Sequence, residues 1–420
     1  MSLSVVEICA GAGGQALGLD LAGFQHRLAI EIDHHAANTL RHNRPLWDVR
    51  VGDVADISVW NPGDFDGVDL LAGGVPCPPF SMAGKQLGAE DERDLFAWAV
   101  EAVGMMRPRA VLLENVRGLS MPRFAAYRQR VKDRLLELGY WSDWKLLEAK
   151  DFGVPQLRPR FVLVALSHED AAYFKWPEPR ADVLSVGTVL ESLMAANGWA
   201  GAQDWARRAN SIGPTIVGGS KKHGGADLGP TRAKAAWKKL SVDGSGVADS
   251  APSSDMPINF MPKLTIPMVS RIQGWDGNEY AWEFQGRKTS VYRQIGNAFP
   301  PPVARAVGES IANALNNVGT PRNLHEIVSG EVVHDPIYRV LVAADSPLSP
   351  SAAIKRARVS MSRDEFMGHM NRLRHDFEVE VHGTDKRPTF KLGTFKGFTG
   401  QAEHARHSAF SDKSARSRIS

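Results

Sequence analysis

The sequence is poor in cysteine, in long apolar runs and in net charge. Its only two cysteines, Cys9 and Cys77, are too few for a disulfide framework. No run of about eighteen apolar residues occurs, and Met1–Ser4 lacks the basic flank of a signal peptide, so no membrane contact is expected. With 43% hydrophobic and 23% charged residues, the 420-residue chain is typical of a soluble, cytoplasmic protein of two or three domains.

The net charge of +3 is too small to indicate a nucleic-acid surface spread over the whole molecule. Basic residues exceed acidic ones by nine to five in residues 201–268, and by sixteen to twelve in residues 321–420. Residues 1–200 and 269–320 together are net negative. Any nucleic-acid surface is therefore expected to be local, and the basic excess lies outside residues 1–200 and 269–320.

Short apolar stretches alternate with helical stretches from the N-terminus onward. Strands are predicted at Val5–Cys9, Arg27–Ile32, Val49–Val54, Asp69–Gly74 and Ala110–Asn115, with helices at Gln15–Ala22 and Ala36–Arg41. This alternation predicts an α/β fold with a doubly wound, mostly parallel sheet. Because such sheets bind ligands at the carboxyl ends of their strands, side chains at those ends are the candidates for function.

A glycine-rich turn, Ala10–Gly14, follows the first predicted strand. Glycines let the backbone approach a ligand closely, and Glu31, twenty residues after Gly11, is placed to bind ribose hydroxyls. Asp53 can accept a hydrogen bond from an adenine amino group. The turn lacks both a Walker lysine and the strict dinucleotide pattern, which favours an adenosyl ligand without a pyrophosphate. The alternative is a tightly packed turn that binds nothing.

Cys77 lies between two prolines in the run Gly73–Ser81, which favours an extended turn over a helix. Attack requires a thiolate, and a thiol with a pKa of about 8.5 is only slightly ionised at neutral pH. Cations are therefore expected nearby, and Arg158 and Arg160 are the candidates. The alternative is an inert, buried cysteine.

Glu114 ends the fifth predicted strand and supplies a carboxyl group. Carbon 5 of cytosine is a poor nucleophile until a thiolate adds to carbon 6, and an acid near ring nitrogen 3 stabilises the enamine that forms. Burial would have to raise the pKa of Glu114 for that role. A solvated strand end is the alternative. Together, Cys77 and Glu114 indicate covalent methyl transfer to a pyrimidine.

The order of these motifs resembles that of the DNA (cytosine-5) methyltransferases of bacterial restriction–modification systems. The resemblance covers residues 5–178 and 264–310. Its matching pieces are Ala10–Gly14, Glu31–Asp33, Gly52–Val54, Pro76-Cys77, Glu114–Val116, Gln156–Arg160, Arg271–Gly274 and Gln294–Ala298. It implies a class I, Rossmann-like fold that binds S-adenosyl-L-methionine, and no metal. The family usually has a phenylalanine that stacks on adenine where this chain has Cys9, which is expected to be a buried packing residue.

The resemblance also implies roles for individual residues. Cys77 would be the nucleophile, Glu114 and Arg160 would hold a flipped cytosine, and Arg158 would support the loop and strand behind it. The cofactor would lie against Ala10, Gly11, Gly13, Glu31, Asp53 and Asn297. In the loop Ser81–Arg93, which would close over DNA and help extrude the base, Ser81 and Lys85 are expected to contact DNA.

The chain is predicted to divide into a catalytic, cofactor-binding domain (1–178), a smaller target-recognition domain (179–268), and a return to the catalytic domain (269–320). In the recognition domain, Lys221, Lys222 and Arg232 are the candidate DNA contacts, and Arg232 has the geometry to read guanine. Solvated surface charge is the alternative for each of them.

An α+β extension is predicted at residues 334–395. Helices at 338–344, at 351–358 and from Ser362 to His375 precede a hairpin with a basic tip. This order suggests a winged-helix module that binds DNA, contacts a partner or merely extends the fold. Residues 401–420 are predicted to be a disordered tail.

The sequence thus predicts a bacterial, cytoplasmic and monomeric enzyme. It would transfer a methyl group from S-adenosyl-L-methionine to carbon 5 of cytosine in a specific double-stranded DNA sequence, and protect host DNA from a separate restriction endonuclease. Amino-directed DNA methyltransferases are disfavoured because Cys77 is a poor acceptor for an exocyclic amine. A tRNA methyltransferase is disfavoured by the long recognition segment. A DNA-binding regulator with a silent core is disfavoured by the presence of both Cys77 and Glu114.

Overall fold

The computed structural model describes residues 2–75, 93–218, 226–323 and 332–396. The strands are β1 (Leu3–Ile8), β2 (Phe24–Glu31), β3 (Val49–Val51), β4 (Leu70–Gly73), β5 (Ala110–Val116), β6 (Tyr140–Glu148), β7 (Pro159–Ser167), β8 (Phe377–Thr384) and β9 (Arg387–Phe395). The helices of the first half are α1 (Gly14–Leu21), α2 (His34–Asn43), α3 (Arg93–Met106), α4 (Ala125–Glu137) and α5 (His168–Ala171). The later helices are α6 (Val186–Met194), α7 (Ala202–Arg208), α8 (Thr231–Lys239), α9 (Ile266–Ile272), α10 (Lys288–Asn297), α11 (Pro301–Leu315), α13 (Pro336–Val342), α14 (Pro350–Ala357) and α15 (Arg363–Asp376).

Seven strands form one sheet in the order β3-β2-β1-β4-β5-β7-β6. Strands β1 to β5 pair in parallel, whereas β7 runs antiparallel to both β5 and β6. The predicted doubly wound, mostly parallel sheet is therefore confirmed. Each of the five predicted strands is present, but the third is shorter than predicted and ends at Val51, two residues before Asp53.

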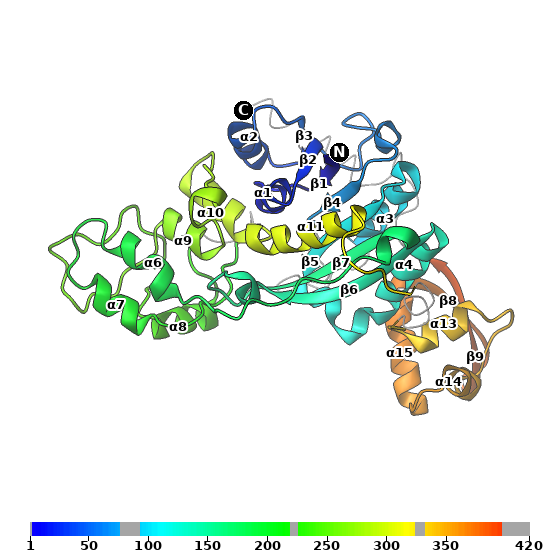
Figure 1. Cartoon of the computed structure of the whole chain (residues 1–420). Helices are drawn as coiled ribbons and strands as arrows, with labels where there is room; N and C mark the ends of the chain where they lie inside the picture. The colour runs from blue at the N-terminus through cyan, green and yellow to red at the C-terminus, as the bar shows by residue number, and fades with distance from the viewer. Residues whose placement is uncertain (1, 76–92, 219–225, 324–331, 397–420) are drawn as a thin grey trace, which may run out of the picture.

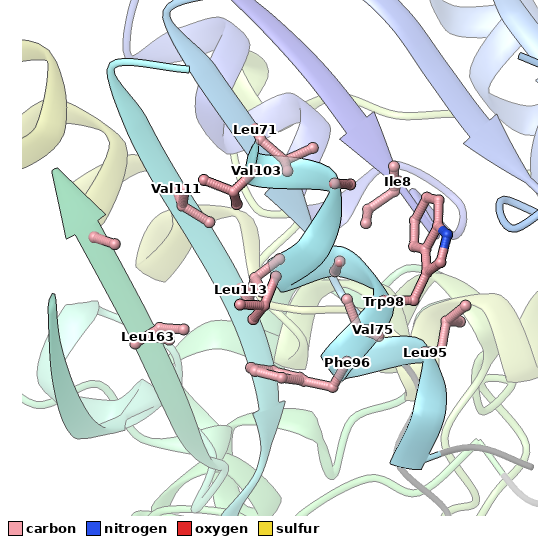
Figure 2. Close-up of a cluster of buried hydrophobic side chains, with 14 of the residues drawn as sticks. Ile8, Leu71, Val75, Leu95, Phe96, Trp98, Val103, Val111, Leu113 and Leu163 are labelled. Atoms are coloured by element: carbon pink, nitrogen blue, oxygen red, sulfur yellow. The ribbon is translucent and has the colours of Figure 1, made fainter. Parts of the chain in front are cut away.

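Both faces of the sheet are buried, because successive residues of a strand point to opposite sides. Along β5, Val111 and Leu113 face one apolar cluster, and Ala110 and Leu112 face the other. Figure 2 shows the first cluster, in which α3 packs on the strands through Leu95, Phe96, Trp98 and Val103. Side chains buried in this way stabilise the fold by about 1.5–3 kcal/mol each.

On the other face, α11 packs directly on α1. A Cβ added at Gly18 of α1 would lie 2.5 Å from the Cβ of Ala304 and 2.6 Å from the backbone nitrogen of Arg305. Glycine is therefore required for this backbone approach. The contact brings the chain after α10 beside the glycine-rich turn at the start of α1.

The segment 179–268 packs in an apolar cluster that it shares with α9, α10 and Leu17 of α1. Its many glycines and prolines predicted loops on a compact scaffold. The structure shows that it also contains three helices, α6, α7 and α8, which were not predicted. They pack around buried Trp199, Trp205 and Trp237, together with side chains of α9 and α10. Figure 1 shows this part at the left end of the molecule.

The C-terminal residues form a separate unit at the lower right of Figure 1. Its three helices and the β8–β9 hairpin enclose a fourth apolar cluster that includes Ala126 of α4. The predicted helix cap is confirmed: Ser362 Oγ accepts the Glu365 N–H at 3.2 Å, and Glu365 Oε2 accepts the Ser362 N–H at 2.7 Å. Residues 401–420 lie outside the described ranges. Within those ranges, no helix has the length and apolar character that a membrane span needs.

Candidate functional site

A cavity of about 1070 Å³ lies at the carboxyl ends of β1, β2, β4 and β5. It is closed on one side by residues 287–299, from α10 and the turn before α11. Six of the residues predicted from the sequence line it together: Ala10, Gly11, Glu31, Asp53, Glu114 and Asn297. The sheet thus places the glycine-rich turn and the carboxyl group of Glu114 in one space.

The turn after β1 is held by Glu31. Gly11, with φ +58°, donates its backbone N–H to Glu31 Oε2 at 2.7 Å, and Asp33 donates its own to Glu31 Oε1 at 2.8 Å. Burial raises the pKa of Glu31, and these two N–H groups oppose the shift. Each carboxylate oxygen keeps a further lone pair for a ligand hydroxyl.

Asp53 and Asn297 line other walls of the same cavity. Asp53 is buried and accepts the backbone N–H of Ala55 at 3.0 Å. Asn297 is the last residue of α10, and Gly218 packs against its side chain so closely that no Cβ fits there. The segment 179–268 therefore meets the cavity wall at Asn297.

Gly13 does not line the cavity and instead packs against Trp282. A Cβ at Gly13 would lie 2.5 Å from the Trp282 ring, and Trp282 Nε1 donates to the carbonyl of Ala12 at 2.8 Å. The guanidinium of Arg44 lies 5.1 Å from the centre of the same ring and pairs with Asp20 at 2.8 Å. Trp282 thus supports the turn from behind. Trp282 could not be found from the sequence, because a lone tryptophan between two motifs carries no local signal.

Gln15 was also missed, although it directly follows the glycine-rich run. It lines the cavity and is 3% exposed. Neither its amide oxygen nor its amide nitrogen makes a hydrogen bond with any residue that the structure describes. A buried amide without partners is costly, so a ligand in this cavity would satisfy it.

Glu114 and Arg160 form a buried ion pair. They come from neighbouring strands, with Arg160 of β7 opposite Val116 of β5, and the Arg160 Nε lies 2.5 Å from Glu114 Oε1. Burial raises the pKa of Glu114, while Arg160 and Arg158 oppose that shift. The arrangement therefore supplies a carboxyl group that holds a proton more readily than one in water, with a guanidinium that fixes its orientation.

Arg158 is fully enclosed and binds the backbone rather than the cavity. Its guanidinium donates to the carbonyl oxygens of Ile216 at 2.7 Å, Gly296 at 2.7 Å and Ala298 at 2.8 Å. It therefore ties the chain just before β7 to the segment 179–268 and to the turn between α10 and α11. This geometry suits the supporting role that the resemblance implied.

Cys77 itself lies outside the described residues, as do Ser81, Lys85, Lys221 and Lys222. The chain is described as far as Val75, whose carbonyl accepts a hydrogen bond from the Asn115 side chain at 3.1 Å. The strand end that carries Glu114 is thus tied to the chain two residues before Cys77.

Arg232 lies outside this cavity, exposed in the first turn of α8. Cys9, expected to be buried, is half-buried: it lines the cavity while packing against the sheet core. Its φ of +51° is unusual for a residue other than glycine. The backbone conformation at the start of the turn, rather than core packing alone, therefore sets the environment of Cys9.

Comparison with known proteins identifies the family. Residues 3–313 match the family described as C-5 cytosine-specific DNA methylase. Type II methyltransferase M.NaeI of Lentzea aerocolonigenes is 58% identical over 409 residues, which cover 97% of this chain and 98% of that protein. Type II methyltransferase M.NgoMIV of Neisseria gonorrhoeae is 48% identical over 318 residues, covering 75% of this chain and 99% of that protein.

Solved structures agree on the fold. A mutant DNMT2 of Spodoptera frugiperda superimposes with a TM-score of 0.50 at 16% identity, covering 74% of this chain and 100% of that one. The methyltransferase EhMeth of Entamoeba histolytica superimposes with a TM-score of 0.51 at 12% identity, covering 75% of this chain and 99% of that one. With a sheet of the expected topology and a family match over most of its length, the chain belongs to the C-5 cytosine-specific DNA methylases and is a DNA cytosine-5 methyltransferase of the restriction–modification type.

Proposed function

We propose that the enzyme takes its methyl group from S-adenosyl-L-methionine and passes it to carbon 5 of a flipped cytosine that is covalently bound to Cys77. The observation that supports this most is the shared cavity. Glu31 and Glu114 line the same space, so a donor held at the glycine-rich turn and a base held at Glu114 would face each other.

The cavity residues fit an adenosyl donor. Gly11 has open space where a side chain would be, Glu31 has lone pairs for ribose hydroxyls, and Gln15 has an amide that lacks partners among the described residues. Asp53 adds a further acidic group to the wall. The sulfonium of the donor supplies an electrophilic methyl group, and its positive charge suits a cavity lined by carboxylates.

Cys77, Glu114 and Arg160 would each have a separate role in the reaction. The Cys77 thiolate bonds to carbon 6, and the electron pair of the 5,6 double bond is drawn toward ring nitrogen 3, where Glu114 donates its proton. Carbon 5 of the enamine then attacks the methyl group. A base, such as a water molecule, then takes the carbon 5 proton, and that electron pair restores the 5,6 double bond as the Cys77 thiolate leaves. Ring nitrogen 3 returns its proton to Glu114, which completes the transfer. Arg160 keeps the Glu114 carboxyl in position throughout.

The substrate in this proposal is a specific sequence of duplex DNA. Ser81 and Lys85 would act at the extruded base, and Lys221, Lys222 and Arg232 at the groove and the phosphates. The enzyme would act as a monomer in the bacterial cytoplasm, where methylation protects host DNA from a separate endonuclease. Retaining a cytosine in the stack blocks the reaction, so extrusion must precede it.

A duplex with 5-fluorocytosine at the target position tests this proposal. Fluorine cannot leave as a proton does, so the wild-type protein should remain covalently attached after methyl transfer, as a band that survives denaturing electrophoresis. Cys77→Ala should bind the same duplex and form no adduct. Bisulfite sequencing of DNA from cells that express the enzyme identifies the target. Methylation found only on amino groups, or no adduct despite proven donor and DNA binding, would contradict the mechanism.

Trp282→Phe should weaken donor binding by about three- to tenfold, the loss of one neutral hydrogen bond, with little change in kcat. The phenyl ring still packs under Gly13, but the bond to the Ala12 carbonyl is gone. Calorimetric donor affinity and a comparison of KM with kcat measure the effect. Trp47→Phe is the control, because Trp47 stacks on His26 at 3.9 Å and does not line the cavity. Equal losses in both variants would refute a positioning role for Trp282.

A further inference from the structure

The C-terminal unit, residues 336–396, carries more positive charge than the complete chain. It has eleven Lys and Arg against seven Asp and Glu, whereas the whole chain has a net charge of +3. We call these residues the C-terminal module. The relative from Neisseria aligns over 99% of its own length with only 75% of this chain, so about a quarter of this chain has no counterpart there. The family match ends at residue 313, before the module begins.

The module has its own order of elements. Helix α13 is followed by Leu348, which pairs with Phe390 of β9 through two hydrogen bonds of 2.8 Å, one from each backbone N–H. Helices α14 and α15 come next, and then the β8–β9 hairpin, so that β9 lies between Leu348 and β8. This is the winged-helix arrangement, a helix-turn-helix variant in which the hairpin is the wing. Helix-turn-helix proteins place the second helix of the pair on DNA.

Exposed cations gather where three parts of the module meet. Helix α14 ends just before α15 begins, and Arg363 at the start of α15 donates to the carbonyl of Lys386 at the wing tip, at 3.0 Å. The wing patch is defined as five exposed basic residues at these ends: Arg356, Arg358, Arg363, Lys386 and Arg387. The adjoining exposed carboxylates are Asp364 and Asp385, together with Glu365, which is engaged in the cap of α15. The patch is therefore net positive.

The face of α15 opposite the module core is exposed to solvent. Phe366, Met370 and Leu373 bury one face of this helix in the module core. The residues left exposed near its C-terminal end are polar or basic: Asn371, Arg372, Arg374 and His375. A helix that buries one side and presents amide and guanidinium groups on the other has the side chains that contact phosphates and base edges.

The C-terminal module is attached to α4, the helix that follows β5. Gln129 Oε1 on α4 accepts the His334 N–H at 2.8 Å, and Asp133 pairs with Arg339 at 3.0 Å. Helix α4 follows β5, which carries Glu114, and lies with α3 on one face of the sheet. Helix α3 is where the described chain resumes after the segment that contains Cys77. The module is therefore attached to the face of the sheet that α3 and α4 cover.

We propose that the C-terminal module is a second site for duplex DNA, which grips the phosphate backbone outside the target sequence through the wing patch. The partner follows from charge complementarity, because the substrate of this enzyme is itself a polyanion. The module would add affinity and hold the enzyme on longer DNA without taking part in methyl transfer. The inference uses the DNA substrate of the family and is independent of the covalent mechanism.

The test compares two target duplexes, one that ends near the target and one extended by about two helical turns on each side. Fluorescence anisotropy over a series of salt concentrations gives the affinity for each duplex and the slope of log affinity against log salt concentration. Wild-type protein should bind the long duplex more tightly, and Arg356→Gln/Lys386→Gln/Arg387→Gln should remove most of that gain. The dependence of log affinity on log salt should become shallower by about 0.9 for each phosphate that the variant no longer neutralises.

The control variant removes the same charge from exposed positions outside the module: Arg27→Gln/Arg107→Gln/Lys175→Gln. It should keep the affinity and the slope of the wild type on both duplexes. The wing variant should still methylate the short duplex at the wild-type rate, because the site itself is untouched. Identical affinity and slope for wild type and wing variant on the long duplex would overturn the proposal, as expected if the module instead binds a protein. Failure of the 5-fluorocytosine adduct would count against the proposed mechanism alone.

Discussion

Glu114→Gln should lower the rate of methyl transfer by about a hundredfold or more and leave DNA binding almost unchanged, because general acid catalysis contributes about 10²–10⁴ in rate. Glutamine has nearly the same shape and can still donate a hydrogen bond to ring nitrogen 3, but it has no proton to transfer. Single-turnover methylation, with affinity measured separately, distinguishes the two effects. Glu101→Gln is the matched control, since Glu101 pairs with Arg134 at 2.7 Å away from the cavity.

The pH profile tests the same role. Burial raises the pKa of Glu114, so its protonated form survives to a higher pH than in water, and the rate should fall as pH rises through that pKa. At low pH the rate should fall for a different reason, the loss of the Cys77 thiolate. Glu114→Gln should remove the alkaline decline and keep the acidic one. An alkaline decline that persists unchanged in the variant would exclude Glu114 as the proton donor.

Arg158→Met should reduce the free energy of unfolding by about 3–5 kcal/mol, since three enclosed carbonyl groups lose their donor at once. Methionine fills most of the volume, so the effect should come from the carbonyls of Ile216, Gly296 and Ala298 rather than from a void. Urea unfolding followed by tryptophan fluorescence measures it.

Arg158→Lys separates charge from geometry in the same experiment. A lysine keeps the charge but lacks the planar fork that reaches several acceptors, so it should recover only part of the stability. At a temperature where Arg158→Met is still folded, it should retain measurable methylation. Full stability combined with complete loss of activity would mean that Arg158 acts on the substrate directly.

Contacts between residues that are close in sequence could be predicted from their spacing. Glu31 lies twenty residues after Gly11, at the end of the strand that follows the first helix, so its place beside the glycine-rich turn could be anticipated from the sequence. The place of Glu114 near the end of β5 could be anticipated in the same way. The alternation of apolar residues predicted the parallel strands for the same reason. The roles of the predicted residues remain predictions, since Cys77, the proposed nucleophile, lies outside the described residues.

Long-range contacts were not predictable in this way. Trp282 reaches the turn at Ala12 across 270 residues, and Arg158 binds carbonyls near residues 216 and 296, with no periodicity or spacing to signal either contact. Gly13 shows the converse. Its place in a glycine-rich motif predicted a ligand contact, but the tryptophan behind it explains the glycine equally well. The motif thus identifies the turn, but it does not show whether a given glycine contacts a ligand or packs against the protein behind the turn.

The contact between Gly218 and Asn297 limits where segments equivalent to residues 179–268 can be exchanged among relatives. Gly218 fits against Asn297 only because it lacks a side chain, and Ile216 is fastened to the strand behind by Arg158. Such an exchange would preserve the architecture when the junction falls after Gly218. A junction before Ile216 would import a foreign surface into the cavity wall, so under the proposed function an altered target choice would come with weaker donor binding.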